Sequence, residues 1–441
     1  MKKIYMNLLN FSLRLKGFPM KEAQKEFQHI LSVSDEAYAS YIEAKKAEIL
    51  QFHFENNPTY KKLLGGKLPK NWEDVPVMTK QDSQQPLQQR LSKDFAKKDV
   101  FVNKTSGSSG NPFIFAKDKF CHALTWTHIF SRYKLHNIVP NQSFEARFYG
   151  IPKDVMGYQK ERLKDKMAGR FRFNIYDLSD AILAEFVEEF KRKKFDYING
   201  YTSSIVQFAK YVLSQNIDIK QICPTLKLCI VTSEMLFEED TKILEKAFQV
   251  PVVNEYGASE LDLIAFQNPQ DEWEVNSKTL WVEILDNENQ PVPLGEEGNV
   301  VITSLYNKAH PFIRYKIGDV GVLDQSSTAK KPILKKLIGR TNDFAILPSG
   351  KRVPGLTFYY VTKSVIEDKG VVKEIKVLQK TTSHFEVQYA AERQLNPEEI
   401  KAIENAMTKY LEPGLQIEFS RLTTLERSKS GKLKQFTSLL S

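Results

Sequence analysis

The chain has 441 residues, too many for one ordinary hydrophobic core, so we expect two domains or one large domain with an appendage. Hydrophobic residues make up 41% and charged residues 27%, as in folded soluble proteins, and no apolar run is long enough to span a bilayer. Three cysteines are too few for a disulfide framework or a four-cysteine zinc site. The net charge of +9 leaves nucleic-acid binding open as an alternative, although no nucleic-acid motif accompanies the basic clusters at 160–172 and 191–194.

The N-terminal region predicts helices. Residues 1–9 are only faintly like a signal peptide, because polar residues follow closely and no small-residue cleavage site is present. We therefore expect an amphipathic helix there and a cytoplasmic protein. Ser34 begins a second helical pattern that ends before Asn57. Its shared face comprises Tyr38, Ile42, Ile49 and Phe52.

A loop rich in hydroxyls and glycine follows at residues 105–112. Its glycines let backbone N–H groups turn inward, and its four hydroxyls can donate hydrogen bonds to phosphate oxygens. Considered alone, the segment is as consistent with a flexible linker. It is neither a Walker loop, because Asn111 stands where lysine is required, nor a dinucleotide-binding glycine motif.

The middle of the chain alternates short β-like runs with helical ones. This alternation predicts layers of helices and strands, and hence an α/β fold. The strand candidates are 226–232, 250–254, 280–285 and 298–304, and the helix candidates are 117–134, 180–193, 203–215 and 237–248.

After Gly339 the order of predicted elements differs from that in the middle of the chain. Strands are expected at 373–379, 384–390 and 415–421. Between the last two, Asn396 caps a helix, and Pro397 takes its first position. The expected buried stripe of that helix is Ile400, Ile403, Met407 and Tyr410. We thus expect a large N-terminal multilayer α/β domain, residues 1–340, and a small mobile C-terminal α+β domain, residues 341–441.

Further polar signatures follow the loop in a fixed order. In Asn254–Glu260, at the end of a predicted strand, Tyr256 can stack on a flat base and Glu260 can hold hydrated Mg²⁺. A glycine turn flanked by surface acids explains that segment about as well. Asp319 can accept both hydroxyls of a ribose, and the loop 428–432 can deliver one ammonium group to a distant site.

Taken in order, these motifs resemble the adenylate-forming superfamily of acyl-CoA synthetases, peptide-synthetase adenylation domains and luciferases. The similarity covers Thr-Ser-Gly-Ser-Ser-Gly-Asn-Pro at 105–112, Tyr-Gly-Ala-Ser-Glu at 256–260, Arg-Tyr-Lys-Ile-Gly-Asp at 314–319, Gly-Arg-Thr-Asn-Asp at 339–343 and Ser-Gly-Lys at 430–432. Residues 57–60, 75–80, 199–204 and 310–315 also resemble the phenylacetate–CoA ligase branch, including the CapK-like proteins of capsular polysaccharide biosynthesis.

The resemblance implies that a carboxylic acid is activated by ATP and Mg²⁺ as acyl-AMP and then transferred to an acceptor, with CoA as the leading candidate. By the same resemblance, Lys432 and Glu260 are catalytic, and Glu260 binds the metal. The nucleotide-binding residues would be Thr105, Ser106, Gly107, Ser108, Ser109, Gly110, Ser233, Glu234, Glu255, Tyr256, Gly257, Ser259, Asp319 and Arg340.

The acid would lie against Tyr149, Gly150, Tyr201 and Ser203, which suit an aryl or apolar acid, although such residues are equally ordinary in a core. The small domain would rotate about Asn342 or Asp343. The chain departs from the family pattern at Asn342, where the hinge is usually acidic, and at 426–428, where the final loop usually begins Pro-Lys-Thr. An amino sugar or a carrier protein remains an alternative acceptor, and a relative that only binds nucleotide is another alternative. The sequence does not determine the oligomeric state, and a homodimer is one possibility.

Overall fold

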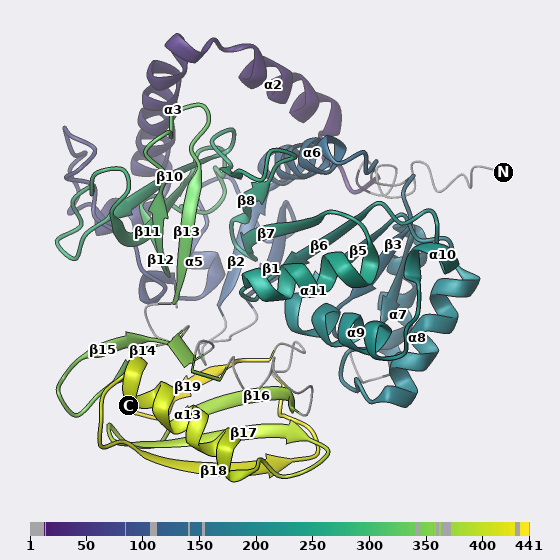
Figure 1. Cartoon of the computed structure of the whole chain (residues 1–441). Coiled ribbons are helices and arrows are strands. Elements are labelled where there is room, and N and C mark those ends of the chain that lie inside the picture. Colours follow the sequence, from purple (N-terminus) through teal and green to yellow (C-terminus); the bar gives the residue numbers. More distant parts are fainter. Residues whose placement is uncertain are drawn as a thin grey trace. The chain divides into compact units, whose positions relative to one another are not determined.

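The computed structural model describes residues 13, 15–83, 85–105, 113–139, 142–151, 155–340, 344–355, 357–358, 361–362, 372–427 and 433–440. The helix expected at residues 1–9 lies outside this part of the chain. Two compact units are present, a large one formed by 1–317 with 321–336 and a small one formed by 318–320 with 337–441 (Figure 1).

The large unit begins with helices. These are α2 (Met20–Ser32), α3 (Asp35–Asn56), α4 (Pro58–Leu63) and α5 (Leu87–Arg90), with a short 3₁₀ turn at Gln81–Ser83. The predicted start of α3 is confirmed, because the Ser34 side chain accepts a hydrogen bond from the Ala37 N–H at 3.3 Å. Three of its four predicted apolar positions, Tyr38, Ile42 and Ile49, are fully buried.

A seven-stranded sheet forms the centre of the large unit. Its order is β4 (Arg170–Phe173), β3 (Glu145–Phe148), β5 (Tyr197–Tyr201), β6 (Leu228–Thr232), β7 (Val252–Ala258), β8 (Asp262–Gln267) and β9 (Trp273–Val275). The first five strands are parallel, and β8 and β9 are antiparallel to their neighbours. Such a sheet presents the carboxyl ends of its parallel strands along one edge, where ligands bind in open α/β folds.

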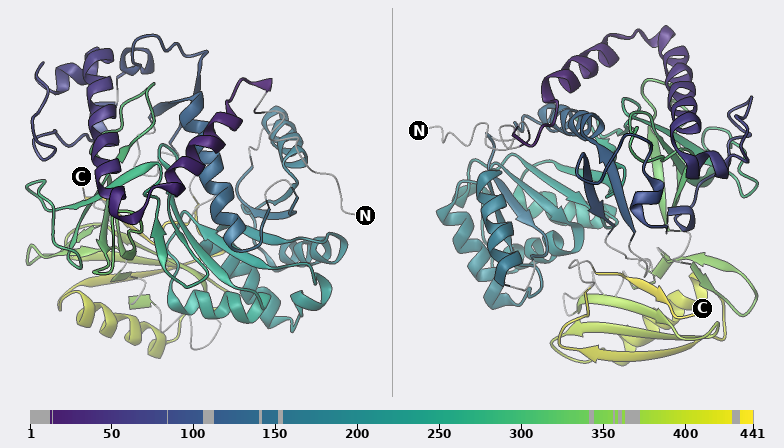
Figure 2. Two further views of the ribbon diagram at one scale, coloured as in Figure 1. Left: turned by 90° about the horizontal axis from the view of Figure 1, so that it is seen from above. Right: turned by 180° about the vertical axis from the view of Figure 1, so that it is seen from behind.

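Helices cover both faces of this sheet (Figures 1 and 2). On one face, α8 (Asp180–Arg192), α9 (Thr202–Ser214) and α11 (Glu238–Phe248) bury an aromatic core that includes Phe148, Phe173 and Phe208; α10 (Ile219–Ile222) adds Ile219. On the other, Ile129 and Tyr133 of α6 (Lys119–Leu135) pack on a smaller cluster with Phe266. The α/β class predicted from the sequence is confirmed.

Two smaller sheets lie wholly or mainly in the large unit. The hairpin of β1 (Val100–Lys104) and β2 (Ile114–Asp118) is antiparallel. A four-stranded sheet has the order β10 (Leu280–Leu285), β11 (Glu297–Ser304), β12 (Tyr315–Leu323) and β13 (Leu334–Arg340).

The small unit is an α+β fold. Strands β18 (Gln416–Leu422), β17 (His384–Ala391), β16 (Val372–Gln379) and β19 (Phe436–Ser438) form its main sheet, and β14 (Phe344–Ile346) pairs with β15 (Arg352–Pro354). Helix α13 (Pro397–Tyr410) has the predicted cap, since the Asn396 side chain accepts from the Glu399 N–H at 2.8 Å. Ile403 and Met407 are buried as expected. The prediction for Tyr410 is wrong: it is 41% exposed, because it is the last helical residue and lies beyond the stripe that contacts the sheet.

One strand extends well beyond its predicted end. The run 250–254 predicted a short strand, but β7 continues to Ala258, because residues Glu255 to Ala258 also pair with the antiparallel β8. The Tyr-Gly-x-Ser-Glu motif therefore begins inside a strand rather than after one. Among the described residues, no helix is long and apolar enough to cross a membrane.

Two buried histidines lead to a prediction about how the free energy of unfolding depends on pH. Burial lowers the pKa of His53 and of His122 from 6.5 to about 4. In the unfolded chain these histidines are protonated near pH 6.5, whereas in the folded chain they are protonated only near pH 4. The free energy of unfolding therefore falls as the pH falls from 6.5 to 4. We expect a loss on the order of 3 kcal/mol per histidine, measured by urea unfolding between pH 7 and 4. His53→Gln should flatten this dependence, and an unchanged slope would contradict the assignment.

Candidate active site

The glycine- and hydroxyl-rich loop connects the two strands of the β1–β2 hairpin. Thr105, which is 7% exposed, donates its N–H to the Phe113 carbonyl at 3.0 Å and accepts the Phe113 N–H on its hydroxyl at 3.1 Å. Because Thr105 and Phe113 bond to each other, the two ends of the intervening segment lie side by side, unlike the ends of a linker between domains. Residues 106–112, and with them the predicted ligands Ser106, Gly107, Ser108, Ser109 and Gly110, lie outside the described residues.

Phe113 links this loop to Glu260 through Tyr315. The Phe113 and Tyr315 rings lie 6.5 Å apart between centroids, and the Tyr315 hydroxyl donates to Glu260 Oε1 at 3.1 Å. Tyr315 is 1% exposed and Glu260 7% exposed. Three signatures separated by up to 210 positions therefore meet in the large unit, and Tyr315, which was noticed only as part of a motif, is a residue that orients Glu260.

Tyr315 is itself fixed by the connector at 72–80. Met78 donates its N–H to the Arg314 carbonyl at 2.9 Å and accepts the Lys316 N–H at 2.8 Å. The Arg314 guanidinium, which is almost fully buried, donates from Nη1 to the carbonyls of Glu73 and Val75, each at 2.8 Å. The arginine of the Arg-Tyr-x-x-Gly-Asp motif thus has a structural role in this chain.

A testable consequence concerns Tyr315 as a positioning residue. Tyr315→Phe removes the hydrogen bond to the Glu260 carboxylate, and a bond to a charged acceptor contributes enough for a loss of about tenfold in the adenylation that the motif resemblance implies. We expect this loss to appear mainly as a higher Mg²⁺ concentration needed for half-maximal pyrophosphate exchange. The matched control is Tyr60→Phe, because the buried Tyr60 hydroxyl has no hydrogen-bond partner among the described residues. Equal Mg²⁺ dependence in both variants would contradict this role.

The β7–β8 hairpin carries the Tyr-Gly-x-Ser-Glu segment. Gly257 is required there, because a Cβ at this position would lie 2.6 Å from the Asp262 carbonyl oxygen. Tyr256 is 9% exposed, and its ring lies edge-on to Trp273 at 6.1 Å. Ser259 and Glu260 follow at the turn, and Ser259 is exposed.

Glu255 lies beside Thr232 across the parallel β6–β7 pair. Its carboxylate accepts the Tyr133 hydroxyl at 3.1 Å. Burial raises the pKa of Glu255, and the hydrogen bonds from Tyr133 and Thr232 partly offset this. Tyr133 comes from α6 and was not singled out in the sequence, where no motif contains it.

The segment after β6 joins two predicted groups of residues. Ser233 is exposed and has φ +69°, a strained backbone conformation of the kind that gathers at functional sites. Next to it, Glu234 Oε2 accepts the Ser203 N–H at 2.7 Å, in the first turn of α9. A residue predicted to bind nucleotide therefore lies against one predicted to bind the acid.

The other predicted acid-binding residues also lie together. The rings of Tyr149 and Tyr201 are 4.6 Å apart, and the Gly150 carbonyl accepts from Arg172 Nη1 at 2.9 Å. The Arg147 guanidinium lies 4.0 Å from the centre of the Tyr149 ring and forms an ion pair with Glu145 at 2.7 Å. The sequence motifs do not include Arg147; its alternation with Glu145 on β3 and with Tyr149, directly after the strand, is the signal that could have found it.

The two residues predicted to hold the ribose lie on neighbouring strands. Asp319 lies on β12 and is 8% exposed, and Arg340 is the last residue of β13. The Arg340 side chain, the proposed hinge residues Asn342 and Asp343, and the proposed catalytic Lys432 lie outside the described part of the chain.

Glu260 is the candidate metal ligand that the motifs indicate. The described residues hold no cluster of three or more His, Cys, Asp or Glu side chains suited to a metal ion. A Mg²⁺–nucleotide site needs only one or two protein carboxylates, because phosphate oxygens and water supply the other ligands. A single buried carboxylate with Oε1 fixed by Tyr315 fits that requirement.

Comparison with solved structures identifies the fold. A 2-hydroxyisobutyryl-CoA ligase, determined in its postadenylation state in complex with R3-HIB-AMP, superimposes with a TM-score of 0.69 over 90% of this chain and 88% of its own, at 16% identity. The chain has the fold of the adenylate-forming enzymes. Anthranilate CoA ligase AuaEII, in complex with anthranoyl-AMP, matches with a TM-score of 0.54 over 78% of this chain and 67% of its own, at 15% identity.

A sequence relative supports the same branch of the adenylate-forming enzymes. The CapK protein of Staphylococcus aureus is 24% identical over 317 residues, which are 70% of this chain and 67% of CapK. No protein-family model matches the chain. The resemblance noted in the motifs is thus confirmed for the fold, and the similarity to CapK supports the CapK-like branch.

Proposed function

We propose that the chain is an ATP-dependent carboxylate ligase. A carboxylate oxygen of the acid attacks the α-phosphorus of ATP, the bond to the β-phosphate breaks, and acyl-AMP and pyrophosphate form. A thiol then attacks the acyl carbon, and AMP leaves. Because negative charge builds on the phosphate oxygens in the first step, fixed donors and a metal must stabilise it.

Each predicted residue has a place in this scheme. Thr105 and the hydroxyls that follow it would hold the β- and γ-phosphates, and Glu260 would bind Mg²⁺, which neutralises phosphate charge when bound. Glu255 and Tyr256 would flank adenine, with Ser233 and Glu234 nearby. Asp319 and Arg340 would hold the ribose, and Lys432 would bridge the carboxylate and the α-phosphate. The small domain, residues 341–441, would rotate about Asn342 or Asp343 between the two steps.

The observation that carries the proposal is the contact series from Thr105 through Phe113 and Tyr315 to Glu260. It connects the ends of the loop proposed to bind phosphate with the carboxylate proposed to hold the metal. Among the described residues, the hydrogen bond that Glu260 accepts comes from a neutral phenol, and a cation such as Mg²⁺ would further stabilise a carboxylate of this burial. The test is pyrophosphate exchange into ATP, dependent on Mg²⁺, across a panel of carboxylic acids.

The acid we propose has an aryl or apolar body. The close pair of Tyr149 and Tyr201 offers aromatic surface for it. Gly150 lies beside them, with its carbonyl fixed by Arg172. Ser203 closes the group at the first turn of α9.

CoA is the leading acceptor in this proposal, since two of the similar solved structures are named CoA ligases. The similarity to CapK favours the second candidate, in which the acyl group passes to an amino sugar or a carrier protein. AMP release, measured with CoA, amino sugars or a carrier protein as acceptor, separates the two. In either case the first half-reaction is the same.

We favour a ligase over a nucleic-acid-binding protein because three of the six basic residues in the cluster at 160–172, and three of the four at 191–194, form ion pairs within the protein. Lys164, Arg170 and Arg172 form ion pairs with Glu161 or Asp165. Lys191, Arg192 and Lys193 form them with Glu188 or Glu189. Salt-dependent binding to duplex DNA without acid-dependent pyrophosphate exchange would reverse this preference.

A further inference from the structure

Helix α7 (Val155–Met167) has an inverted pattern of burial. Its one buried residue is Asp165, which is 2% exposed. In contrast, Met156 is 82% exposed and Leu163 is 61% exposed. A surface helix of a globular protein normally turns its apolar stripe to the core and its charges to water. The large apolar side chains of α7 therefore do not stabilise its attachment to the large unit.

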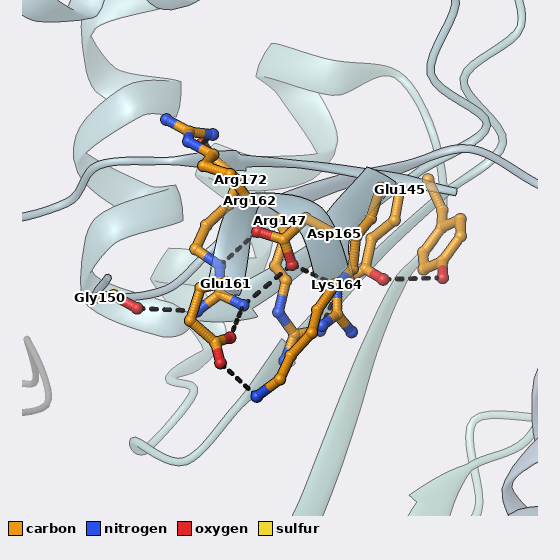
Figure 3. Close-up of polar contacts among 10 residues, drawn as sticks. Glu145, Arg147, Gly150, Glu161, Arg162, Lys164, Asp165 and Arg172 are labelled. Atoms are coloured by element: carbon orange, nitrogen blue, oxygen red, sulfur yellow. Dashed lines mark hydrogen bonds and ion pairs between the residues drawn. The ribbon is translucent and has the colours of Figure 1, made fainter. Parts of the chain in front are cut away.

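Ion pairs attach this helix instead. Asp165 accepts from Arg170 Nε at 2.6 Å and from Arg172 Nε at 2.9 Å, and Glu161, one turn earlier, accepts from Arg172 Nη2 at 2.9 Å. Figure 3 shows Glu161 and Asp165 of α7 pointing toward Arg172 of β4. Since both carboxylates must face the sheet, the rotation of α7 about its axis is fixed.

The rotation of α7 determines which side chains lie on the face of the helix that points away from the sheet. With about 100° per residue, Met156, Leu163 and Met167 fall in one line along the helix, on the side away from Glu161 and Asp165. Lys160 falls on one flank of this line and Lys166 on the other, and both are exposed. We call these five residues the outer face of α7.

We propose that the outer face of α7 docks on an anionic lipid bilayer. An apolar stripe with lysines on both flanks is the pattern of helices that lie in a membrane interface. The long lysine side chains can keep their ammonium groups at the headgroups while the stripe enters the acyl boundary. The net charge of +9 adds a longer-range attraction to anionic lipid.

Charge also argues against a second copy of the chain as the occupant. Two outer faces packed together by a two-fold axis would bring Lys160 and Lys166 of both copies close to one another, which is unfavourable without acidic partners. The acids of α7 cannot serve, because Glu161 and Asp165 are engaged with Arg172 on the other side. An anionic bilayer can take up the apolar stripe at its acyl boundary and pair with the flanking lysines at its headgroups.

The test is co-sedimentation of the full chain with vesicles. We expect binding to vesicles of equal parts phosphatidylcholine and phosphatidylglycerol, and little binding to phosphatidylcholine alone. The double variant Met156→Ser/Leu163→Ser should bind at least about tenfold more weakly, since it removes the stripe. Lys160→Gln/Lys166→Gln should bind several-fold more weakly, and added salt should weaken the parent protein similarly.

Matched controls use residues outside this face. Leu294→Ser changes a leucine that is 44% exposed, and Lys21→Gln/Lys25→Gln removes two charges from exposed positions of α2. Both should bind as the parent protein does, and thermal unfolding should confirm that every variant is folded. The proposal is overturned if the parent protein ignores anionic vesicles or if the stripe variant binds normally. Loss of a dimer in the stripe variant, in sedimentation equilibrium without vesicle binding, would assign the face to a second copy.

Discussion

Glu260→Gln is expected to lower acid-dependent pyrophosphate exchange by two to three orders of magnitude. The substitution keeps the size and planar shape of the side chain, and its amide oxygen can still accept the Tyr315 hydroxyl. What is lost is the negative charge, and with it the attraction for a divalent cation beside the phosphates. Loss of one preorganised electrostatic group at a reacting phosphate costs about 10²–10³ in rate.

The readout separates this effect from damage to the fold. Exchange is measured over a range of Mg²⁺ concentrations, and excess Mg²⁺ should restore part of the activity of Glu260→Gln. The matched control, Glu288→Gln, neutralises an exposed glutamate in the turn after β10 and should retain full activity. Normal exchange in Glu260→Gln at limiting Mg²⁺ would remove Glu260 from the proposed site without contradicting the ligase activity itself.

Local chemistry made several elements predictable. Asn396, Pro397 and Glu399 contain the signal for the start of α13 within four residues, and the structure has that capping box. The Ser34 cap likewise made the start of α3 predictable. The order of apolar and polar runs was enough for the α/β class, because buried parallel strands and amphipathic helices differ in their periodicity.

Other features depend on contacts between elements that are distant in the sequence, and the sequence pattern did not predict them. Nothing near Tyr133 in the chain points to Glu255, which lies 122 positions away, and the pair meets only when α6 packs on the sheet. The extension of β7 depends on pairing with β8, which no run in residues 250–254 reveals. Tyr315 and Glu260 were each quoted in a motif, but their hydrogen bond follows from the packing of β12 and not from either motif.

The inverted helix α7 is the clearest conflict between local pattern and tertiary structure. Its sequence has both apolar and acidic residues at helical spacing, so periodicity alone allows either face to turn inward. Arg170 and Arg172 on β4 decide the matter, because a buried guanidinium needs a carboxylate more than it needs an apolar neighbour. The outward stripe is therefore a consequence of residues on a different element.

Lys432→Ala is expected to lower the adenylation rate at least about a hundredfold, as loss of a donor that acts in the transition state does. Because the lysine is proposed to bridge the attacking carboxylate and the α-phosphate, ATP binding, measured by equilibrium titration, should be nearly unchanged. The second half-reaction, started with supplied acyl-AMP and acceptor, should also be largely preserved, since no phosphate is then displaced by a carboxylate.

This split distinguishes a catalytic lysine from one that merely supports the small unit. The control Lys409→Ala removes an exposed lysine from the last turn of α13, in the same unit, and should leave both half-reactions intact. If Lys432→Ala slows both half-reactions equally and lowers the melting temperature, its role is structural. If it slows neither, the attacking carboxylate must be paired by another cation, and the resemblance of Ser-Gly-Lys at 430–432 to the family motif would carry no catalytic meaning here.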